Sequence, residues 1–261
     1  MKKIFLALIT ALVIFFNVSN AQNDTMYIMK SGIVTGKYNV YTQIDSIIFY
    51  QPVIQTSNTL TDSRDSSVYQ IVTIGSQVWM AENLRYLPSV ADQNTYSDAI
   101  SYYYVYGYDG TNVNDAKATA NYSTYGVLYN WPAAMAGSAS SSTNPSGVQG
   151  VCPTGWHLPS DAEWAELINY LGGESVAGSK LKETGTNHWE ISDEGATNET
   201  GFTALPGGYF CNMFDEIGMS GYWWSSTEYN ANKAWLVNIS FGIIKVKLYK
   251  DEGFSVRCVR D

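Results

Sequence analysis

The chain begins with a long apolar run and continues in short β-type runs. Residues 4–16 are apolar except for Thr10, follow two lysines, and precede small residues that end at Ala21. This order is typical of a secretory signal peptide with its cleavage site. A membrane-spanning helix needs about 20 apolar residues. Residues 1–21 are therefore interpreted as a cleaved signal peptide, with an uncleaved N-terminal anchor as the alternative.

Beyond residue 21 the pattern of apolar and polar positions predicts three parts. Residues 22–52 carry short apolar runs separated by glycine-containing turns, which indicates a small β-strand module. A module of this length is too small for a core of its own, so we expect it to dock on something else. Residues 53–66 are small, polar and aperiodic, and they are predicted to be a linker. Residues 67–261 are predicted to form one large domain.

Within the large domain, the pattern predicts a hairpin, a well-marked helix and several strands. Residues 68–74 and 77–80 flank a Gly-Ser pair, which predicts a β-hairpin with a two-residue turn. Ser160 and Glu163 have the spacing of a capping box, and apolar residues then recur every three or four positions up to a Gly-Gly pair. A weaker helical pattern and further strands follow at 176–182, 221–226, 234–239, 243–248 and 254–259. The mixture predicts an α+β fold with irregular loops.

Composition and charge narrow the classes of function. The chain is 45% hydrophobic and only 15% charged, which excludes a disordered tail. Its formal net charge is −9, and removal of the signal peptide with its two lysines makes it −11. A nucleic-acid partner is therefore not expected, because phosphate binding needs a basic face. We expect no membrane insertion after signal cleavage and a location in the periplasm, on the cell surface or outside the cell.

The three cysteines, Cys152, Cys211 and Cys258, allow one disulfide and one free thiol in an oxidising compartment. Their spacing does not select the pair, and three unpaired buried cysteines are the alternative. A bridge between Cys152 and Cys258 would close a loop of about 100 residues and contribute about 4–5 kcal/mol in the chain-entropy model.

Familiar catalytic and metal-binding motifs are absent from the sequence. His157 and His188 lie outside any metal-ligand spacing, and His157 is interpreted as a satisfied, partly buried side chain. There is no G-x-S-x-G nucleophile motif. The acidic cluster of Glu190, Asp193 and Glu194 is interpreted as a charged loop, although paired carboxylates of a glycosidase cannot be recognised from spacing. We therefore predict no catalytic residues, no metal and no cofactor.

The aromatic segment near residue 223 is the best candidate for a ligand site. Trp223, Trp224, Ser226, Glu228 and Tyr229 combine aromatic rings with hydroxyls and a carboxylate, which suits recognition of a sugar or a protein. Strand alternation would bury one tryptophan and expose the other. The alternative is that both tryptophans belong to the core.

Several long motifs resemble those of the Fibrobacter succinogenes major paralogous domain (FISUMP domain). The resemblance covers about residues 68–261. The matching segments are residues 73–85, 126–131, 152–164, 221–228 and 253–260. Residues 25–52 resemble a short N-terminal module found on exported proteins of Bacteroidetes-type bacteria.

The resemblance implies a C-type-lectin-like fold, which is shared with formylglycine-generating-type enzymes. In that fold a bridge commonly joins the helix region to the last strand, which favours Cys152–Cys258 and leaves Cys211 unpaired. Those enzymes bind copper through two cysteines near the C-terminus, whereas this sequence has only Cys258 there. The resemblance therefore implies the fold without the oxidase chemistry.

Taken together, the sequence predicts an exported, non-catalytic binding protein that recognises a glycan or a protein at the cell exterior. A secreted enzyme acting on polysaccharide or oxidising thiols is one alternative. A structural subunit of a surface assembly, in which residues 25–52 donate a strand to a neighbour, is another.

Overall fold

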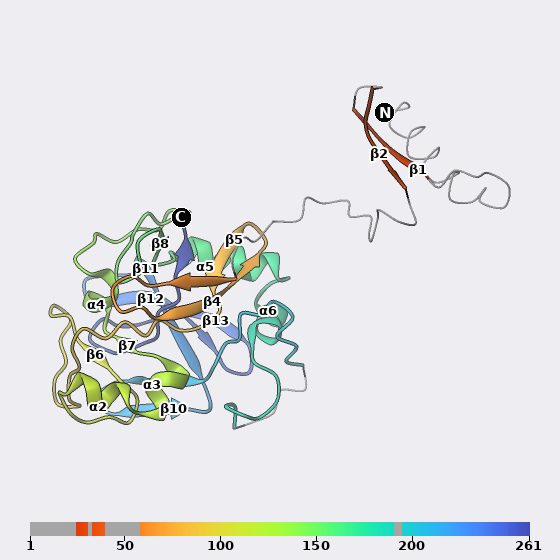
Figure 1. Ribbon diagram of the computed structural model, residues 1–261. Coiled ribbons are helices and arrows are strands. Elements are labelled where there is room, and N and C mark those ends of the chain that lie inside the picture. Colours follow the sequence, from red (N-terminus) through yellow and green to blue (C-terminus); the bar gives the residue numbers. More distant parts are fainter. Residues whose placement is uncertain (1–24, 31–32, 40–57, 191–194) are drawn as a thin grey trace. The chain divides into compact units, whose positions relative to one another are not determined.

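The computed structural model describes residues 25–30, 33–39, 58–190 and 195–261, and the chain divides into a unit of residues 1–55 and a unit of residues 56–261 (Figure 1). In the first unit, β1 (Thr25–Lys30) and β2 (Ile33–Asn39) form an antiparallel pair with a register shift after Ile28. The predicted signal peptide, residues 1–21, lies outside the described residues. So do residues 40–52 of the predicted β module and residues 53–57 of the predicted linker.

The second unit mixes helices with strands, which confirms the α+β interpretation. Its elements in chain order are β3 (Thr59–Thr61), β4 (Val68–Ile74), β5 (Gln77–Met80), β6 (Tyr103–Tyr104), α2 (Val113–Lys117), α3 (Ala120–Tyr125), β7 (Leu128–Tyr129), α4 (Trp131–Met135), β8 (Trp156–His157), α5 (Asp161–Tyr170), α6 (Glu174–Leu181), β9 (Gly207–Phe210), β10 (Phe214–Ile217), β11 (Gly221–Glu228), β12 (Lys233–Ile239), β13 (Ile243–Tyr249) and β14 (Val259–Arg260).

A five-stranded sheet brings the two ends of this unit together in the order β3-β4-β5-β14-β8. β14 is antiparallel to both neighbours, with Val259 opposite Trp79 on β5 and opposite His157 on β8. The predicted hairpin is confirmed, because Ile74 pairs with Gln77 around the two-residue turn. The strand predicted over 254–259 is confirmed only at its end. Its first two residues make isolated bridges instead, Phe254 to β7 and Ser255 to β11, since they run between sheets.

A disulfide joins Cys152, which precedes β8, to Cys258, which precedes β14. The pairing implied by the family resemblance is thus confirmed, and Cys211 is the free thiol. The backbone N–H of Met80 on β5 donates to the carbonyl of Cys258 at 3.0 Å. The bridge therefore lies directly beside the central strand of the sheet.

Residues 58–66, predicted as part of a linker, belong to the domain instead. β3 pairs with β4, and Leu60 packs against the core. The buried carboxylate of Asp62 binds the Arg64 guanidinium at 2.6 Å, and Arg64 also donates to the carbonyl of Val151 at 2.9 Å. Polar composition suggested a linker, but these long-range partners satisfy the polar groups and hold the segment in place.

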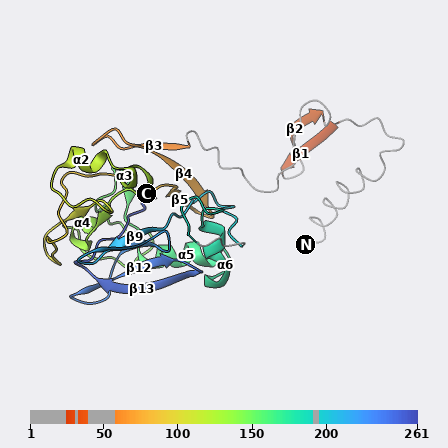
Figure 2. The same ribbon diagram turned by 90° about the horizontal axis from the view of Figure 1, so that it is seen from below.

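A three-stranded antiparallel sheet, β11-β12-β13, lies between two hydrophobic cores. One core contains α5, α6 and Trp223, and the other contains α4, Phe254 and Trp224. Figure 2 shows β12 and β13 side by side along the domain. The α5 helix begins at the predicted capping box of Ser160 and Glu163, and α6 begins two residues earlier than predicted.

Candidate functional site

The two tryptophans proposed as ligand contacts, Trp223 and Trp224, are both fully buried. Alternation along β11 does place them on opposite faces, but each face is covered by a core. Both indole N–H groups donate internally, Trp223 to Asn83 Oδ1 at 2.8 Å and Trp224 to the carbonyl of Tyr129 at 2.7 Å. The expectation that one of them is exposed is therefore wrong, and neither presents its ring to a ligand.

The other three predicted site residues are divided between interior and surface. Ser226 is buried, and its backbone N–H donates to the carbonyl of Pro159 at 2.8 Å. Glu228 is exposed, and its carboxylate pairs with Lys250 at 3.2 Å. Tyr229 has 48% of its surface exposed at the end of β11. Of the predicted set, only Glu228 and Tyr229 are placed to contact a partner.

Tyr229 belongs to a different surface that the sequence analysis did not identify. Trp235 pairs directly with Lys247 across β12 and β13, and Lys233 pairs with Tyr249. Opposed and alternate residues of paired strands share one sheet face. Tyr229 contacts the same face, because its ring lies against Trp235 and beneath Lys247. We call these five residues the aromatic–lysine face.

Cations and rings alternate within the aromatic–lysine face. The Lys247 Nζ lies 4.2 Å from the ring centroid of Tyr229 and 4.9 Å from that of Trp235. The Lys233 Nζ lies 4.1 Å from the ring centroid of Tyr249. Tyr229 and Trp235 meet edge to face, with their ring centroids 5.6 Å apart. Such cation–π and edge-to-face contacts hold partly exposed rings in fixed positions.

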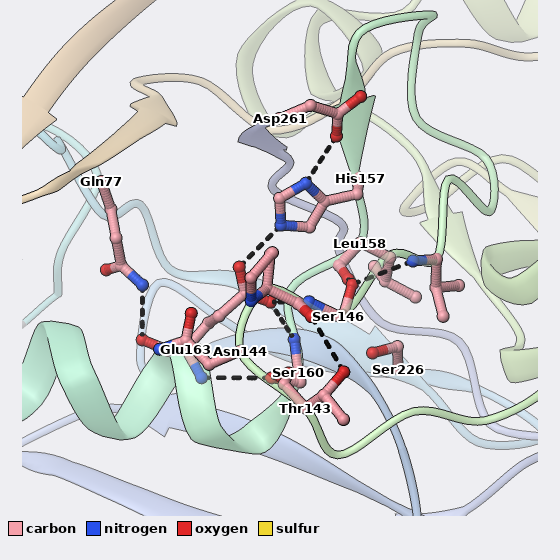
Figure 3. A network of polar contacts seen from close by, with 12 residues as sticks. Gln77, Thr143, Asn144, Ser146, His157, Leu158, Ser160, Glu163, Ser226 and Asp261 are labelled. Atoms are coloured by element: carbon pink, nitrogen blue, oxygen red, sulfur yellow. Dashed lines mark hydrogen bonds and ion pairs between the residues drawn. The ribbon is translucent and has the colours of Figure 1, made fainter.

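A buried polar network lies at the N-terminal end of α5 (Figure 3). The Glu163 Oε2 accepts the backbone N–H of Ser146 at 3.0 Å and that of Ser160 at 2.9 Å. The Glu163 Oε1 lies 2.6 Å from His157 Nε2, and the Asp261 Oδ1 lies 2.7 Å from His157 Nδ1. The network ties β8, α5 and the residue after β14 into one unit.

His157 is a satisfied buried histidine, as predicted, although its partners were not anticipated. Burial lowers the pKa of His157, but hydrogen bonds and charge attraction from Glu163 and Asp261 together raise it above its ordinary value. A cationic imidazole donates from both nitrogens, which matches an acceptor on each side. Because His157 and Glu163 are buried and fully partnered, neither is open to a substrate, and the arrangement stabilises the fold.

A buried arginine beside Trp223 is a second polar element that the sequence analysis missed. Arg257 donates to Asn83 Oδ1 at 3.0 Å, to the carbonyl of Phe202, and to the carbonyl of Thr203 at 2.9 Å. Its guanidinium carbon also lies 4.1 Å from the Phe202 ring centroid. Burial lowers the pKa of Arg257 to about 9, so it is still charged at neutral pH. The cation is held by neutral acceptors and a ring, which indicates a structural role.

A depression of about 430 Å³ is lined by residues of β4, by Ala81 and Glu82 just after β5, and by Gly201 and Thr203. Glu82 is its one charged lining residue among the described residues. The Glu82 carboxylate already accepts the backbone N–H of Gln70 at 2.7 Å and an Arg85 N–H at 3.3 Å. The Glu82 carboxylate in this depression is therefore engaged in contacts within the protein.

The part of the chain that the structure describes forms neither a reactive-cysteine site nor a metal site. Cys258 is bridged, and burial together with Glu252 raises the pKa of the free Cys211 thiol to about 11, which makes it a poor nucleophile at neutral pH. No three His, Cys, Asp or Glu side chains in the described ranges gather as a metal site. Asp193 and Glu194 of the acidic cluster lie outside those ranges. No described helix is long and apolar enough to cross a bilayer.

The aromatic–lysine face had a partial signal in the sequence. Strands at 234–239 and 243–248 were predicted with only three residues between them, which is a hairpin spacing. Pairing these strands would have placed Trp235 opposite Lys247. The missing information was which half of the sheet face the helices cover, because this depends on packing between distant segments.

Comparison with known proteins gives one match. The model of the Fibrobacter succinogenes major domain matches residues 72–260. No curated protein and no solved structure matches the chain.

Proposed function

The chain belongs to the Fibrobacter succinogenes major domain family, and we propose that it is an exported, non-catalytic protein that binds a glycan at the cell exterior through the aromatic–lysine face. One observation carries the proposal. All eight tryptophans lie in described parts of the chain, seven are buried, and Trp235 is the exception. It is partly exposed, its ring contacts that of the exposed Tyr229, and the exposed Tyr249 is its diagonal neighbour on the sheet.

The chemistry of this face suits sugar recognition. Aromatic rings bury a large area at a small cost in side-chain entropy, and they pack against the C–H groups of a sugar ring. Tyr229 and Tyr249 are each about half exposed, so their hydroxyls remain free to give direction. The three rings stand on a rigid antiparallel sheet, which reduces the ordering cost of binding.

Two features support the exported location in the proposal. The predicted signal peptide at residues 1–21 directs a chain across a membrane. The Cys152–Cys258 disulfide is of a kind that persists in oxidising compartments.

We also assign the domain a C-type-lectin-like fold. In support, the bridge links the segment before α5 to the last strand, as the resemblance implies, and the final strand pairs inside the first sheet.

A glycan array with the full chain tests the function. The wild-type protein is expected to bind one class of glycan, and the Tyr229→Ala/Trp235→Ala variant is expected to lose that binding. Tyr96→Ala removes an exposed tyrosine from the loop between β5 and β6 and serves as the matched control. A thermal melt of each variant confirms that it is folded.

Two results would overturn the proposal. One is glycan binding that the folded double variant retains. The other is an array without any binding together with specific capture of a purified surface protein, which would favour the protein ligand instead. Glycan cleavage by the wild-type protein would assign an enzyme and reject the non-catalytic role.

A further inference from the structure

The sheet face that carries Trp235 has a covered half and an open half. Residues 233, 235, 237 and 239 of β12 point to one side, together with their partners on β13. Val237, Ile239 and Ile243 lie in the core beneath α5 and α6. An ion pair of 3.0 Å between Lys245 and Asp161 of α5 marks the border. Beyond it, the aromatic–lysine face extends to the end of both strands.

The two lysines of the open half differ from their neighbours in charge pairing. Within the described part of the chain, no carboxylate oxygen lies within 4.0 Å of the Nζ of Lys233 or Lys247. By contrast, the adjacent Lys245 and Lys250 are both paired. At longer range, the charge of Glu252 interacts with that of Lys233. Unpaired lysines are unexpected here, because the chain has 24 acidic residues and only 15 basic ones.

The aromatic–lysine face carries few charges, and they are regularly spaced. Lys233 and Lys247 occupy diagonal positions across the two strands, and diagonal neighbours lie about 7–8 Å apart. Each lysine has an aromatic ring directly opposite it, Tyr249 for Lys233 and Trp235 for Lys247. The surface therefore offers one cation beside each of two apolar platforms. It lacks the arginine cluster that recognises densely phosphorylated or sulfated ligands.

We propose that the aromatic–lysine face binds a linear polysaccharide that carries carboxylates, such as a polyuronate. This inference rests on the proposed glycan-binding function and names the class of glycan. Each uronate residue combines an apolar ring face, which packs on an aromatic side chain, with one carboxylate, which pairs with an ammonium group. The opposite charges of lysines and ligand also speed encounter, despite the negative net charge of the chain.

Binding of the full chain to polygalacturonate, measured by calorimetry, tests the inference. A neutral galactan is the uncharged probe. Polygalacturonate is expected to bind about tenfold more tightly than the galactan. Its affinity is expected to fall when NaCl is raised from about 0.05 M to about 0.5 M, because salt screens exposed charges.

A matched pair of variants isolates the lysines. Lys233→Gln/Lys247→Gln is expected to weaken binding of polygalacturonate about tenfold, to abolish the salt dependence and to leave binding of the galactan unchanged. The control is Lys117→Gln on α2, which removes another half-buried lysine beside a tyrosine ring and is expected to change nothing.

The outcomes separate this inference from the proposed function. Galactan binding that depends on Trp235, with no preference for polygalacturonate, overturns the acidic class and leaves glycan binding intact. Tighter binding of dextran sulfate overturns the choice of a carboxylated chain. Equal binding of poly-glutamate, or failure of every glycan to bind, overturns both the inference and the glycan-binding function.

Discussion

The imidazole of His157 lies 2.6 Å from the carboxylate of Glu163, although both side chains are almost completely buried. A buried ion pair stabilises a fold only when its remaining polar atoms are also satisfied. Here the second imidazole nitrogen faces Asp261, and the second carboxylate oxygen accepts two backbone N–H groups.

Stability should therefore depend on the charge of His157. Its pKa is raised above the ordinary value of 6.5 in the folded protein, so its contribution is complete below pH 6.5 and is lost as the pH rises through the folded pKa. We expect His157→Gln to cost about 1–3 kcal/mol at low pH and less at higher pH. Urea denaturation of both proteins across this pH window measures the difference. A constant difference would contradict this account.

Asp62 should give the opposite pH dependence. Burial raises the pKa of Asp62, but hydrogen bonds and charge attraction from Arg64 outweigh this and lower it below 3.8. Its contribution is therefore present above about pH 3.8 and is lost as the pH falls through the folded value. Asp62→Asn should reduce stability at neutral pH and remove this part of the acid sensitivity. Asp98→Asn provides a control away from this ion pair, and acid titration of unfolding measures all three proteins.

The buried Arg257 should not tolerate lysine. Its guanidinium reaches three acceptors at once, and an ammonium group has no planar fork with which to replace it. We expect Arg257→Lys to destabilise the domain by about 2–4 kcal/mol, because buried acceptors lose their donors. The exposed Arg260 is three residues away on β14, and Arg260→Lys is expected to have little effect. Similar midpoints of chemical unfolding for the two variants would argue against this role.

The stability cost of replacing a tryptophan should depend on its burial rather than on its position in the sequence. Trp223→Ala and Trp224→Ala are each expected to cost about 3–5 kcal/mol, because each empties a large space in a core. Trp235→Ala should cost less than either of these, since its ring is partly exposed. Calorimetric melting separates these cases. A stable Trp224→Ala variant would mean that β11 does not separate two cores.

The disulfide should contribute strongly to stability. It links residues 106 positions apart, and the chain-entropy model gives about 4–5 kcal/mol for a loop of this size. Cys152→Ser/Cys258→Ser should therefore lower the midpoint of unfolding far more than Cys211→Ser. A thiol titration of the unfolded, unreduced wild-type protein should find one free thiol. Three free thiols would contradict the bridge.

Local signals in the sequence were enough to predict two local elements, a hairpin and a helix. The hairpin at Gly75 and the helix beginning after Ser160 depend on residues within one or two turns of the chain, and both were predicted. The pairing of Cys152 with Cys258 required the family resemblance, because spacing alone allowed other pairs.

The predictions were wrong where the burial of a residue depends on segments that are distant in the sequence. Period-2 alternation correctly put Trp223 and Trp224 on opposite faces, but it carries no information about what covers each face. Phe202 and Phe254, which cover them, come from other parts of the chain. Similarly, residues 58–66 were predicted to be a linker because their composition is polar. In the structure the buried Asp62 pairs with Arg64, which donates to the carbonyl of Val151.

The position of β14 determines when the five-stranded sheet can be completed as the chain is made. This strand fills the gap between β5 and β8, although it is made more than 100 residues after β8 begins. The sheet cannot close on a ribosome until residue 260 has emerged, and such long-range pairing is slow to form. The nascent domain therefore remains incomplete for nearly its entire translation. The five-stranded sheet is complete only after this strand has been inserted between β5 and β8.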